Sequence, residues 1–171
     1  GYGFDYSIEK HIKILQDRGY DIAEKDAVRD LRSCIRKDFI ADDAIEFLQF
    51  LRSFGEEAVL LTAGDPSYQK LKVEITGLCD LVDRCVYLQG NKETFVEEIL
   101  ANGKRVIFVN DNSKENATIK KTFPAAVVIG KINVFKYDKS DVEKSEVPYF
   151  ATLREIQNYM QKLYQGSKKT V

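Results

Sequence analysis

The chain has 171 residues, of which 44% are hydrophobic and 31% charged, so it holds enough apolar material for one substantial core with a small appendage. Its 26 basic and 27 acidic residues give a formal net charge of −1, and no overall field draws it onto nucleic acid or an anionic membrane. No apolar run approaches the roughly 20 residues that cross a bilayer, and the N-terminus lacks the basic and apolar regions of a signal peptide. We therefore expect a cytoplasmic protein that binds neither membrane nor nucleic acid.

Neither the cysteines nor the single histidine predict a site. Cys34, Cys79 and Cys85 are odd in number and show no CxxC spacing, so we expect buried thiols rather than disulfides or structural zinc. His11 lies in a charge-rich helical segment and is expected to be a partly exposed surface residue. A Ser-His-Asp triad would depend on this one histidine alone.

The first third of the chain has helical periodicity. Apolar residues recur there at spacings of three and four, which predicts three helices between Ser7 and Gly55. Gly19 is expected to end the first helix, and Asp42 and Asp43 suit the positive N-terminal end of the third. The three apolar stripes are Ile8, Ile12 and Leu15; Val28, Leu31 and Ile35; and Ala44, Ile45, Leu48 and Leu51.

After Gly55, short continuous apolar runs alternate with helical stretches, a pattern typical of buried parallel strands joined by helices. An α/β fold with an open parallel sheet follows. Asp65 and Ser113 are expected as N-caps, Pro66 as a first helical residue and Gly103 as a stop. The predicted strands are residues 58–61, 106–109 and 125–129, with weaker candidates at 85–88 and 132–137; the predicted helices are 66–76, 92–102, 113–122 and 152–164, and 139–148 is a charged connector.

Ligands of an open parallel sheet bind at the carboxyl ends of its strands, so the residues that follow each apolar run carry the most weight. Residues 62–65 (Thr-Ala-Gly-Asp) offer a hydroxyl and free backbone N–H groups to a phosphate-sized anion, although an ordinary capped turn has the same composition. Asp111 suits Mg²⁺, with Glu115 as a more distant partner, although such turns also arise for conformational reasons alone. Lys92 begins a helix and would neutralise a carboxylate and a phosphoryl group if it points into the same crevice.

Taken in order, these features resemble the haloacid dehalogenase-like superfamily over residues 58–124. Residues 59–65 are similar to the second motif of that family, Lys92 stands at the place of its third-motif lysine, and residues 106–112 resemble its fourth motif, an apolar strand that ends in acids. The other matches are Gln69 and Lys72, which fit a Q-x-x-K pattern, and Asn116 followed by Phe123 and Pro124, which fits the usual continuation.

The resemblance implies a Rossmann-like open parallel sheet flanked by helices, with a small all-helical cap. Residues 1–7 and 56–171 would form the core, and residues 8–55 would form the cap. It further implies a Mg²⁺-dependent phosphohydrolase that cleaves a small phosphate monoester through an aspartyl-phosphate. The implied catalytic residues are Asp5, Thr62 and Lys92; the phosphate-binding residues are Thr62, Ala63, Gly64 and Lys92; and the metal ligands are Asp111 and Asp5.

The first motif departs from the family pattern. In the family, a strand ends in two aspartates separated by one residue and followed by a Thr or Val; the first attacks phosphorus and the second works as acid and base. Here residues 2–9 are the nearest match, with Asp5 as the nucleophile, Ser7 in place of the second aspartate and Glu9 where Thr is usual. Asn110 likewise replaces one of the paired acids of the fourth motif. Three accounts stay open: Asp5 is a weakened nucleophile, the true motif lies upstream of Gly1, or the protein binds without turnover.

Two other classes of protein compete with a phosphohydrolase. The first is a non-catalytic binding or regulatory module that keeps the fold. The absence of the second aspartate suggests it. A response-regulator receiver also combines Asp, Thr and Lys on a parallel sheet, but there the acids come first. Because Thr62 and Lys92 precede Asp111 here, the order disfavours a receiver.

Overall fold

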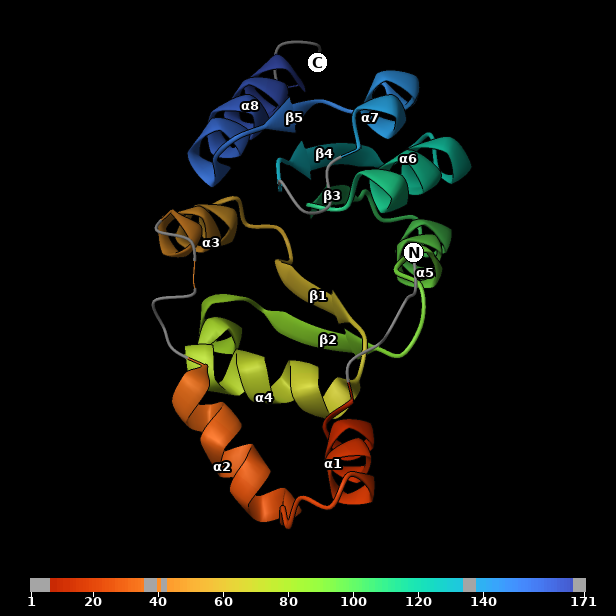
Figure 1. Cartoon of the computed structure of the whole chain (residues 1–171). Helices are drawn as coiled ribbons and strands as arrows, with labels where there is room; N and C mark the ends of the chain where they lie inside the picture. The colour runs from red at the N-terminus through yellow and green to blue at the C-terminus, as the bar shows by residue number, and fades with distance from the viewer. Residues whose placement is uncertain (1–6, 36–39, 41–42, 134–137, 168–171) are drawn as a thin grey trace. The chain divides into compact units, whose positions relative to one another are not determined.

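The computed structural model describes residues 7–35, 40, 43–133 and 138–167. It confirms the predicted α/β class, since every pair of neighbouring strands is parallel and helices flank the strands (Figure 1). The chain divides into two compact units, Gly1–Asn91 and Lys92–Val171. Within the described part of the chain, no helix combines the length and the apolar character needed to cross a membrane.

The first unit contains a two-stranded parallel sheet, β1 (Val59–Ala63) and β2 (Arg84–Leu88), paired in register from Val59↔Arg84 to Ala63↔Leu88. Helix α4 (Pro66–Thr76) connects the strands and packs against both of them. Asp65 caps this helix as predicted, because its carboxylate accepts a 2.8 Å hydrogen bond from the Tyr68 N–H. A short 3₁₀ helix, η2 (Leu78–Leu81), which the sequence pattern did not predict, leads into β2.

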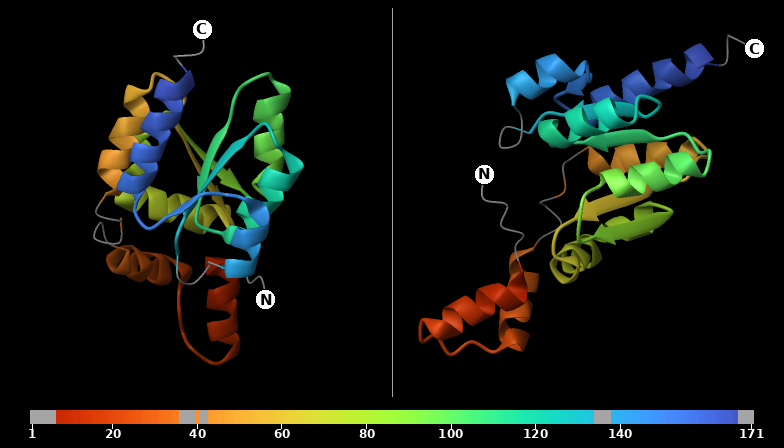
Figure 2. Two further views of the ribbon diagram at one scale, coloured as in Figure 1. Left: turned by 90° about the horizontal axis from the view of Figure 1, so that it is seen from above. Right: turned by 90° about the vertical axis from the view of Figure 1, so that its right-hand side faces the viewer.

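Three helices precede the sheet, as predicted: α1 (Ile8–Asp17), α2 (Glu24–Cys34) and α3 (Ala44–Ser53). Helices α1 and α2 pack against each other (Figure 2). Their apolar stripes share one core with α4. The division into a cap of residues 8–55 and a separate core stays a prediction. The shared core consists of Ile8, Ile12 and Leu71, surrounded by Ala27, Val28, Leu31, Ile35, Tyr68 and Ile75.

The expectation of three buried thiols is wrong. Cys79 and Cys85 form a disulfide that joins η2 to β2, and Cys34 is exposed on α2. Sequence spacing missed the pair because Cys79 lies in the 3₁₀ helix η2, which the sequence pattern did not predict and which brings Cys79 toward Cys85 at the start of β2. His11 is exposed on α1, in line with the expected surface histidine.

The second unit contains a three-stranded parallel sheet in the order β3-β4-β5. Its strands are β3 (Ile107–Asn110), β4 (Val127–Lys131) and β5 (Tyr149–Phe150). Its helices are α5 (Glu93–Ala101), α6 (Ser113–Thr122), α7 (Lys139–Ser145) and α8 (Leu153–Ser167). Helices α6 and α8 both pack against β4, and the core side chains Ile119, Ile129 and Ile156 are fully buried.

Three sequence expectations are wrong in this unit. Strand β4 begins two residues later than predicted, because the Ala126 N–H bonds the Phe123 carbonyl and closes a turn after α6. The charged segment expected to be a connector forms helix α7. Asn112, not Ser113, caps α6; its side chain accepts from two amides of the first turn, while Ser113 is buried and accepts from the Asp138 N–H. Of the candidate edge strand, residues 134–137 lie outside the described part of the chain, as does Asp42.

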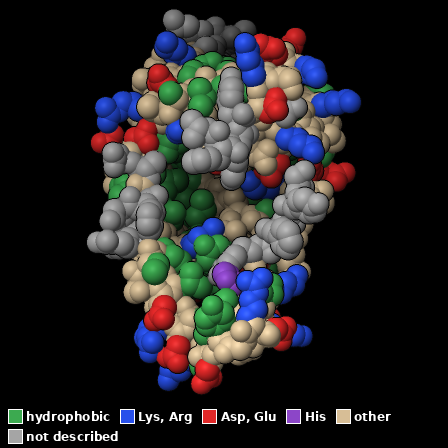
Figure 3. Space-filling view, in the orientation of Figure 1, with side chains coloured by type: hydrophobic (Ala, Val, Ile, Leu, Met, Phe, Trp, Pro, Cys, Tyr) green, Lys and Arg blue, Asp and Glu red, His purple; other side chains and the backbone are tan. Residues whose placement is uncertain are grey.

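On the face drawn in Figure 3, lysine and arginine side chains alternate with aspartate and glutamate side chains. This mixture agrees with the near-neutral net charge of −1. The described ion pairs include surface pairs such as Arg84–Glu57 and Arg29–Asp26, which contribute little to stability because water screens them.

Candidate functional site

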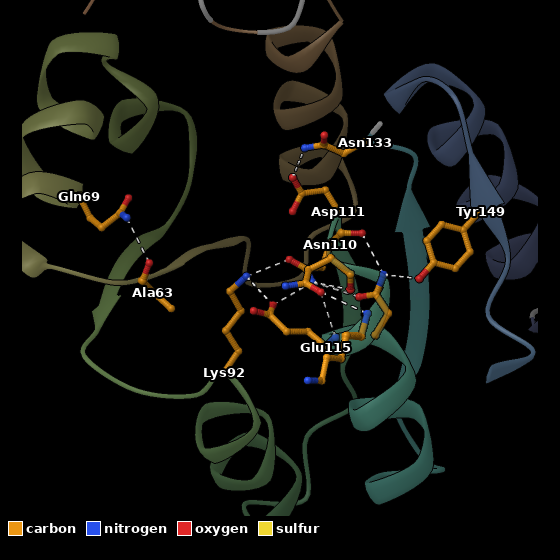
Figure 4. Close-up of polar contacts among 11 residues, drawn as sticks. Ala63, Gln69, Lys92, Asn110, Asp111, Glu115, Asn133 and Tyr149 are labelled. Carbon is orange, nitrogen blue, oxygen red and sulfur yellow. Dashed lines mark hydrogen bonds and ion pairs between the residues drawn. The ribbon is translucent and has the colours of Figure 1, made fainter. Parts of the chain in front are cut away.

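A polar cluster of three side chains, Lys92, Asn110 and Glu115, lies at the carboxyl end of β3 (Figure 4). The Lys92 Nζ donates to Asn110 Oδ1 at 2.9 Å and to Glu115 Oε2 at 3.0 Å. The Asn110 Nδ2 donates to the same Glu115 oxygen at 3.0 Å. Each member therefore contacts the other two, and we call this group the lysine cluster.

Local structure explains why these three residues meet. Lys92 is the N-cap of α5, and Asn110 is the last residue of β3. Asn112 then starts α6, which places Glu115 in its first turn, next to the strand end. A carboxylate in the first turn is also stabilised by the positive end of the helix dipole.

The lysine cluster is sheltered from water on its cationic side. The Lys92 side chain is 15% exposed and that of Glu115 is 35% exposed. A lysine ammonium has three N–H donors. Two of them bond Asn110 and Glu115, and the third has no partner among the residues that the structure describes. The cluster thus presents a fixed cation with one donor left for an anion.

A second layer of hydrogen bonds supports the cluster. Asn116 is fully buried, and its Nδ2 donates to the Asn110 carbonyl at 3.1 Å and to the Tyr149 hydroxyl at 2.9 Å. Its Oδ1 accepts from Asn110 Nδ2 at 3.1 Å. The path therefore runs from β5, through α6, to the end of β3.

Asp111, the predicted metal ligand, directly follows Asn110 and accepts a 2.7 Å hydrogen bond from Asn133 on one carboxylate oxygen. The described residues contain no group of three or more His, Cys, Asp or Glu side chains that would hold a metal ion on its own. Mg²⁺ keeps several waters and needs only one or two protein carboxylates when a phosphate supplies further oxygens. As a hard oxygen donor at a strand end, Asp111 fits such a role.

In the first unit, Thr62 and Ala63 end β1 and Gly64 forms the turn before α4. The Gly64 N–H donates to the Leu88 carbonyl at 3.0 Å, so this amide continues the sheet. The expectation that it is free to bind an anion is therefore wrong. Along a parallel strand, the backbone N–H and C=O groups of successive residues point alternately to one neighbouring strand and to the other. Because Ala58 and Gly64 both bond toward β2, the Ala63 N–H points to the other edge of β1.

The Gly64 turn is held by α4. Gln69 Nε2 donates to the Ala63 carbonyl at 3.1 Å (Figure 4). Gly64 has a φ of 126°, which side-chain-bearing residues rarely adopt, and a Cβ there would lie 3.0 Å from the Gln69 amide nitrogen. Both features explain why glycine follows Thr62 and Ala63 at this strand end.

The expected first motif comprises Asp5, Ser7 and Glu9, and the structure describes the last two of these residues. Asp5 lies outside the described residues. Ser7 is the N-cap of α1, where its hydroxyl accepts a 3.5 Å hydrogen bond from the Lys10 N–H, and Glu9 lies within the helix. Ser7 and Glu9 therefore serve a helix start rather than a strand end.

Among the predicted site residues, Lys92 and Asp111 belong to the second unit and residues 62–64 to the first. Their action on one ligand stays a prediction. Glu115, expected as a distant partner of a metal, forms an ion pair with Lys92, which the sequence did not predict, and its role toward a metal stays a prediction.

Sequence reasoning missed the roles of Asn116, Tyr149 and Asn133. Two signals point to the first two. Asn116 occupies an apolar helical position, three residues before the buried Ile119, and Gly130 interrupts a β-branched strand where another group approaches closely. We find no comparable signal for Asn133.

No family model matches the chain, and no curated protein resembles it significantly in sequence. Solved structures do resemble it. A haloacid dehalogenase-like hydrolase from Burkholderia xenovorans aligns over 87% of this chain and 69% of its own, with a TM-score of 0.69 and 18% identity. A HAD-superfamily hydrolase from Ehrlichia chaffeensis aligns over 94% of this chain and 89% of its own, with a TM-score of 0.52 and 12% identity. A dehalogenase with an intermediate complex aligns over 70% of this chain but only 55% of its own, with a TM-score of 0.57 and 16% identity.

These similarities show that the chain has a haloacid dehalogenase-like fold, as the order of its motifs predicted. At such low identity the likeness concerns the fold, because one fold hosts many chemistries. Function has to be argued from the residues of the site.

Proposed function

We propose that the chain is a hydrolase that cleaves small phosphate monoesters with the help of Mg²⁺. The observation that carries the proposal is the Lys92 ammonium, which Asn110 and Glu115 hold at the end of β3 with one N–H left to donate. A fixed, partly desolvated cation stabilises negative charge that develops on a transferring phosphoryl group. The names of the similar structures, all hydrolases or dehalogenases, support a hydrolytic reaction in general.

The other proposed roles follow from the strand ends. Thr62 would donate its hydroxyl, and Ala63 its outward N–H, to phosphoryl oxygens. Gly64 would give the turn its shape, because its own amide is already bonded to Leu88. Asp111 and Asp5 would hold Mg²⁺, which when bound neutralises charge on the phosphoryl oxygens.

In the proposed reaction, a carboxylate oxygen of Asp5 forms a bond to phosphorus while the ester P–O bond breaks. The leaving oxygen takes its proton from water, because Ser7 cannot replace a carboxylic acid as a donor. Water then attacks the aspartyl-phosphate; phosphate leaves, the carboxylate is restored and a proton goes to solvent. The lack of an acid predicts that aryl phosphates, with stable leaving groups, react faster than alkyl phosphates.

Release of p-nitrophenol from p-nitrophenyl phosphate, with Mg²⁺ or with EDTA, tests the proposal. Lys92→Met should lower kcat/KM by about 10²-fold or more, since it removes preorganised charge stabilisation. Asp111→Asn should abolish the Mg²⁺ dependence, and Asp5→Asn should abolish turnover. Lys114→Met is the matched control, because it removes an exposed lysine of the neighbouring α6 and should leave the rate unchanged. Full activity in Lys92→Met or Asp111→Asn would remove these assignments.

Because one of the similar structures is a dehalogenase, the same preparation should be assayed for halide release from a 2-haloacid. Halide release without phosphate release would replace the proposed substrate class while keeping a carboxylate nucleophile.

A second function is a phosphate-binding module without turnover. It is favoured by Ser7, which caps α1 instead of supplying an acid. Calorimetric titration separates the two functions. Beryllium fluoride with Mg²⁺ mimics an aspartyl-phosphate and needs a competent aspartate, whereas inorganic phosphate binds to an anion pocket alone. Binding of phosphate without binding of beryllium fluoride would favour the module.

A further inference from the structure

We infer that Asn116 and Tyr149 are positioning residues that orient the Asn110 carboxamide and, through it, the Lys92 ammonium. The catalytic consequence of this inference rests on the proposed function. The contacts on which it is built lie entirely within the second unit.

The relay begins on β5, where Tyr149 pairs with Gly130 of β4. A Cβ at position 130 would overlap the Tyr149 ring, so the ring lies directly over the β4 backbone. Glycine thus allows the side chain to cross β4 and bring its hydroxyl to Asn116 on α6. Tyr149, on the last strand of the sheet, thus contacts Asn116, which is hydrogen-bonded to Asn110 at the end of β3.

The orientation of Asn116 is determined by its surroundings. The Asn110 backbone carbonyl only accepts hydrogen bonds, so the nitrogen of the Asn116 carboxamide has to face it. Tyr149 accepts from the same nitrogen. Because Asn116 is fully buried, water cannot replace either partner, and its Oδ1 is left facing Asn110.

The orientation of Asn110 follows from that of Asn116. Its Nδ2 faces three acceptors, and its Oδ1 therefore faces Lys92. The acceptors are Asn116 Oδ1 at 3.1 Å, Glu115 Oε2 at 3.0 Å and, at the longer distance of 3.4 Å, the Asn112 carbonyl. The reversed carboxamide would put its oxygen against these acceptors and its N–H groups against the ammonium. Tyr149, through Asn116, thus adds the buried hydrogen bond that favours the orientation in which Asn110 accepts from Lys92.

The orientation of Asn110 determines the direction in which Lys92 can donate its remaining N–H. With Asn110 and Glu115 each holding one N–H of Lys92, the third N–H has a defined direction. Asn110 achieves this as a neutral acceptor, so the ammonium pairs with one carboxylate, that of Glu115, among the residues that the structure describes. Loss of the Tyr149 hydroxyl should loosen this direction without removing any group that touches Lys92.

The test uses ¹⁵N NMR of the full chain, with the side-chain signals of Asn116, Asn110 and Lys92 assigned. Tyr149→Phe should shift the Asn116 and Asn110 NH₂ signals and the Lys92 NH₃⁺ signal. Tyr159→Phe is the matched control; its ring packs on Phe150, next to Tyr149 in the chain, but lies outside the relay, and none of the three signals should move. A shift confined to Asn116 in Tyr149→Phe would overturn the relay.

The relay can also be probed from its other end, should Tyr149→Phe fail to fold. Lys92→Met removes the partly exposed terminus of the relay and should shift the NH₂ signals of both Asn110 and Asn116. Unchanged signals in this variant would equally overturn the inference.

Kinetics distinguish positioning from a purely structural role. With p-nitrophenyl phosphate, Tyr149→Phe should lower kcat about 3- to 10-fold and change KM less than about twofold, because misdirection of a charge matters most in the transition state. A lower melting temperature with unchanged kcat would show that Tyr149 is only structural and overturn the inference. If the wild type neither hydrolyses nor binds phosphate, the proposed function fails, and the NMR shifts alone decide the relay.

Discussion

At Gly130 the backbone of β4 passes under the Tyr149 ring at a distance that leaves no room for a side chain. The glycine weakens an otherwise β-branched strand, and the tyrosine compensates by covering it and bonding Asn116. Glycine is required at position 130 because of the ring of Tyr149, a residue on another strand. Local secondary-structure propensity does not account for such a requirement.

Gly130→Ala should therefore destabilise the protein by about 1–3 kcal/mol, since the ring has to move out of a packed position. Urea unfolding measures the loss. Gly90→Ala is the matched control, because an added Cβ at this exposed glycine meets no atom within 4 Å, and the change should stay within about 0.5 kcal/mol. Equal effects of the two substitutions would contradict the close approach at Gly130.

Asp111 directly follows β3 and Lys92 caps the start of α5, positions that follow from the local order of strands and helices along the chain. The roles predicted for these two residues stay predictions. The sequence did not predict the ion pair that Glu115 forms with Lys92. Which of several polar neighbours a carboxylate contacts depends on the relative rotation of α5 and α6, and sequence spacing does not encode that rotation.

At the scale of secondary-structure elements, the sequence pattern failed to predict two short helices. Helix α7 and the turn η2 formed in segments whose sequence pattern favoured a connector or no element at all. Short elements have little intrinsic stability, so tertiary contacts decide whether they form. For η2, the Cys79–Cys85 disulfide supplies such a link to β2, and Arg52 of α3 adds a 3.4 Å hydrogen bond to the Asp80 carbonyl.

A thiol-reactive reagent should label one cysteine, Cys34, in the native protein and all three after reduction. Replacing Cys79 and Cys85 together with serine should lower the free energy of unfolding by about 2 kcal/mol, the expected effect of opening so short a loop. Cys34→Ser is the control and should leave stability nearly unchanged. Labelling of three cysteines without a reductant would show that the disulfide does not form.

At the scale of the whole molecule, the described strands form two separate parallel sheets. β1 pairs with β2 alone, and β3 pairs with β4 alone, so one edge of each of these two strands has no partner among the described strands. The proposed function draws Thr62 from one unit and Lys92 from the other. The proposed function therefore predicts that the effects of Thr62 and Lys92 on phosphate binding are coupled.

A double-mutant cycle measures this coupling. Thr62→Val and Lys92→Met should each weaken phosphate binding, and the double variant should lose less than the product of the two losses, with a coupling of about 0.5–3 kcal/mol. Calorimetric dissociation constants for inorganic phosphate provide the values. Thr62→Val combined with Lys114→Met should show no coupling. Independent effects of Thr62 and Lys92 would mean that they do not act on one ligand.

The sequence by itself determined the α/β class, the order of the α-helices and strands from α1 to β4 and the family resemblance, because hydrophobic periodicity, caps and strand-end residues are local properties of the chain. Tertiary structure alone decided the Cys79–Cys85 bond, the pairing of Lys92 with Glu115 and the relay from Tyr149 through Asn116. Those contacts join residues from different elements, and their geometry depends on how the elements pack, which residue order does not specify.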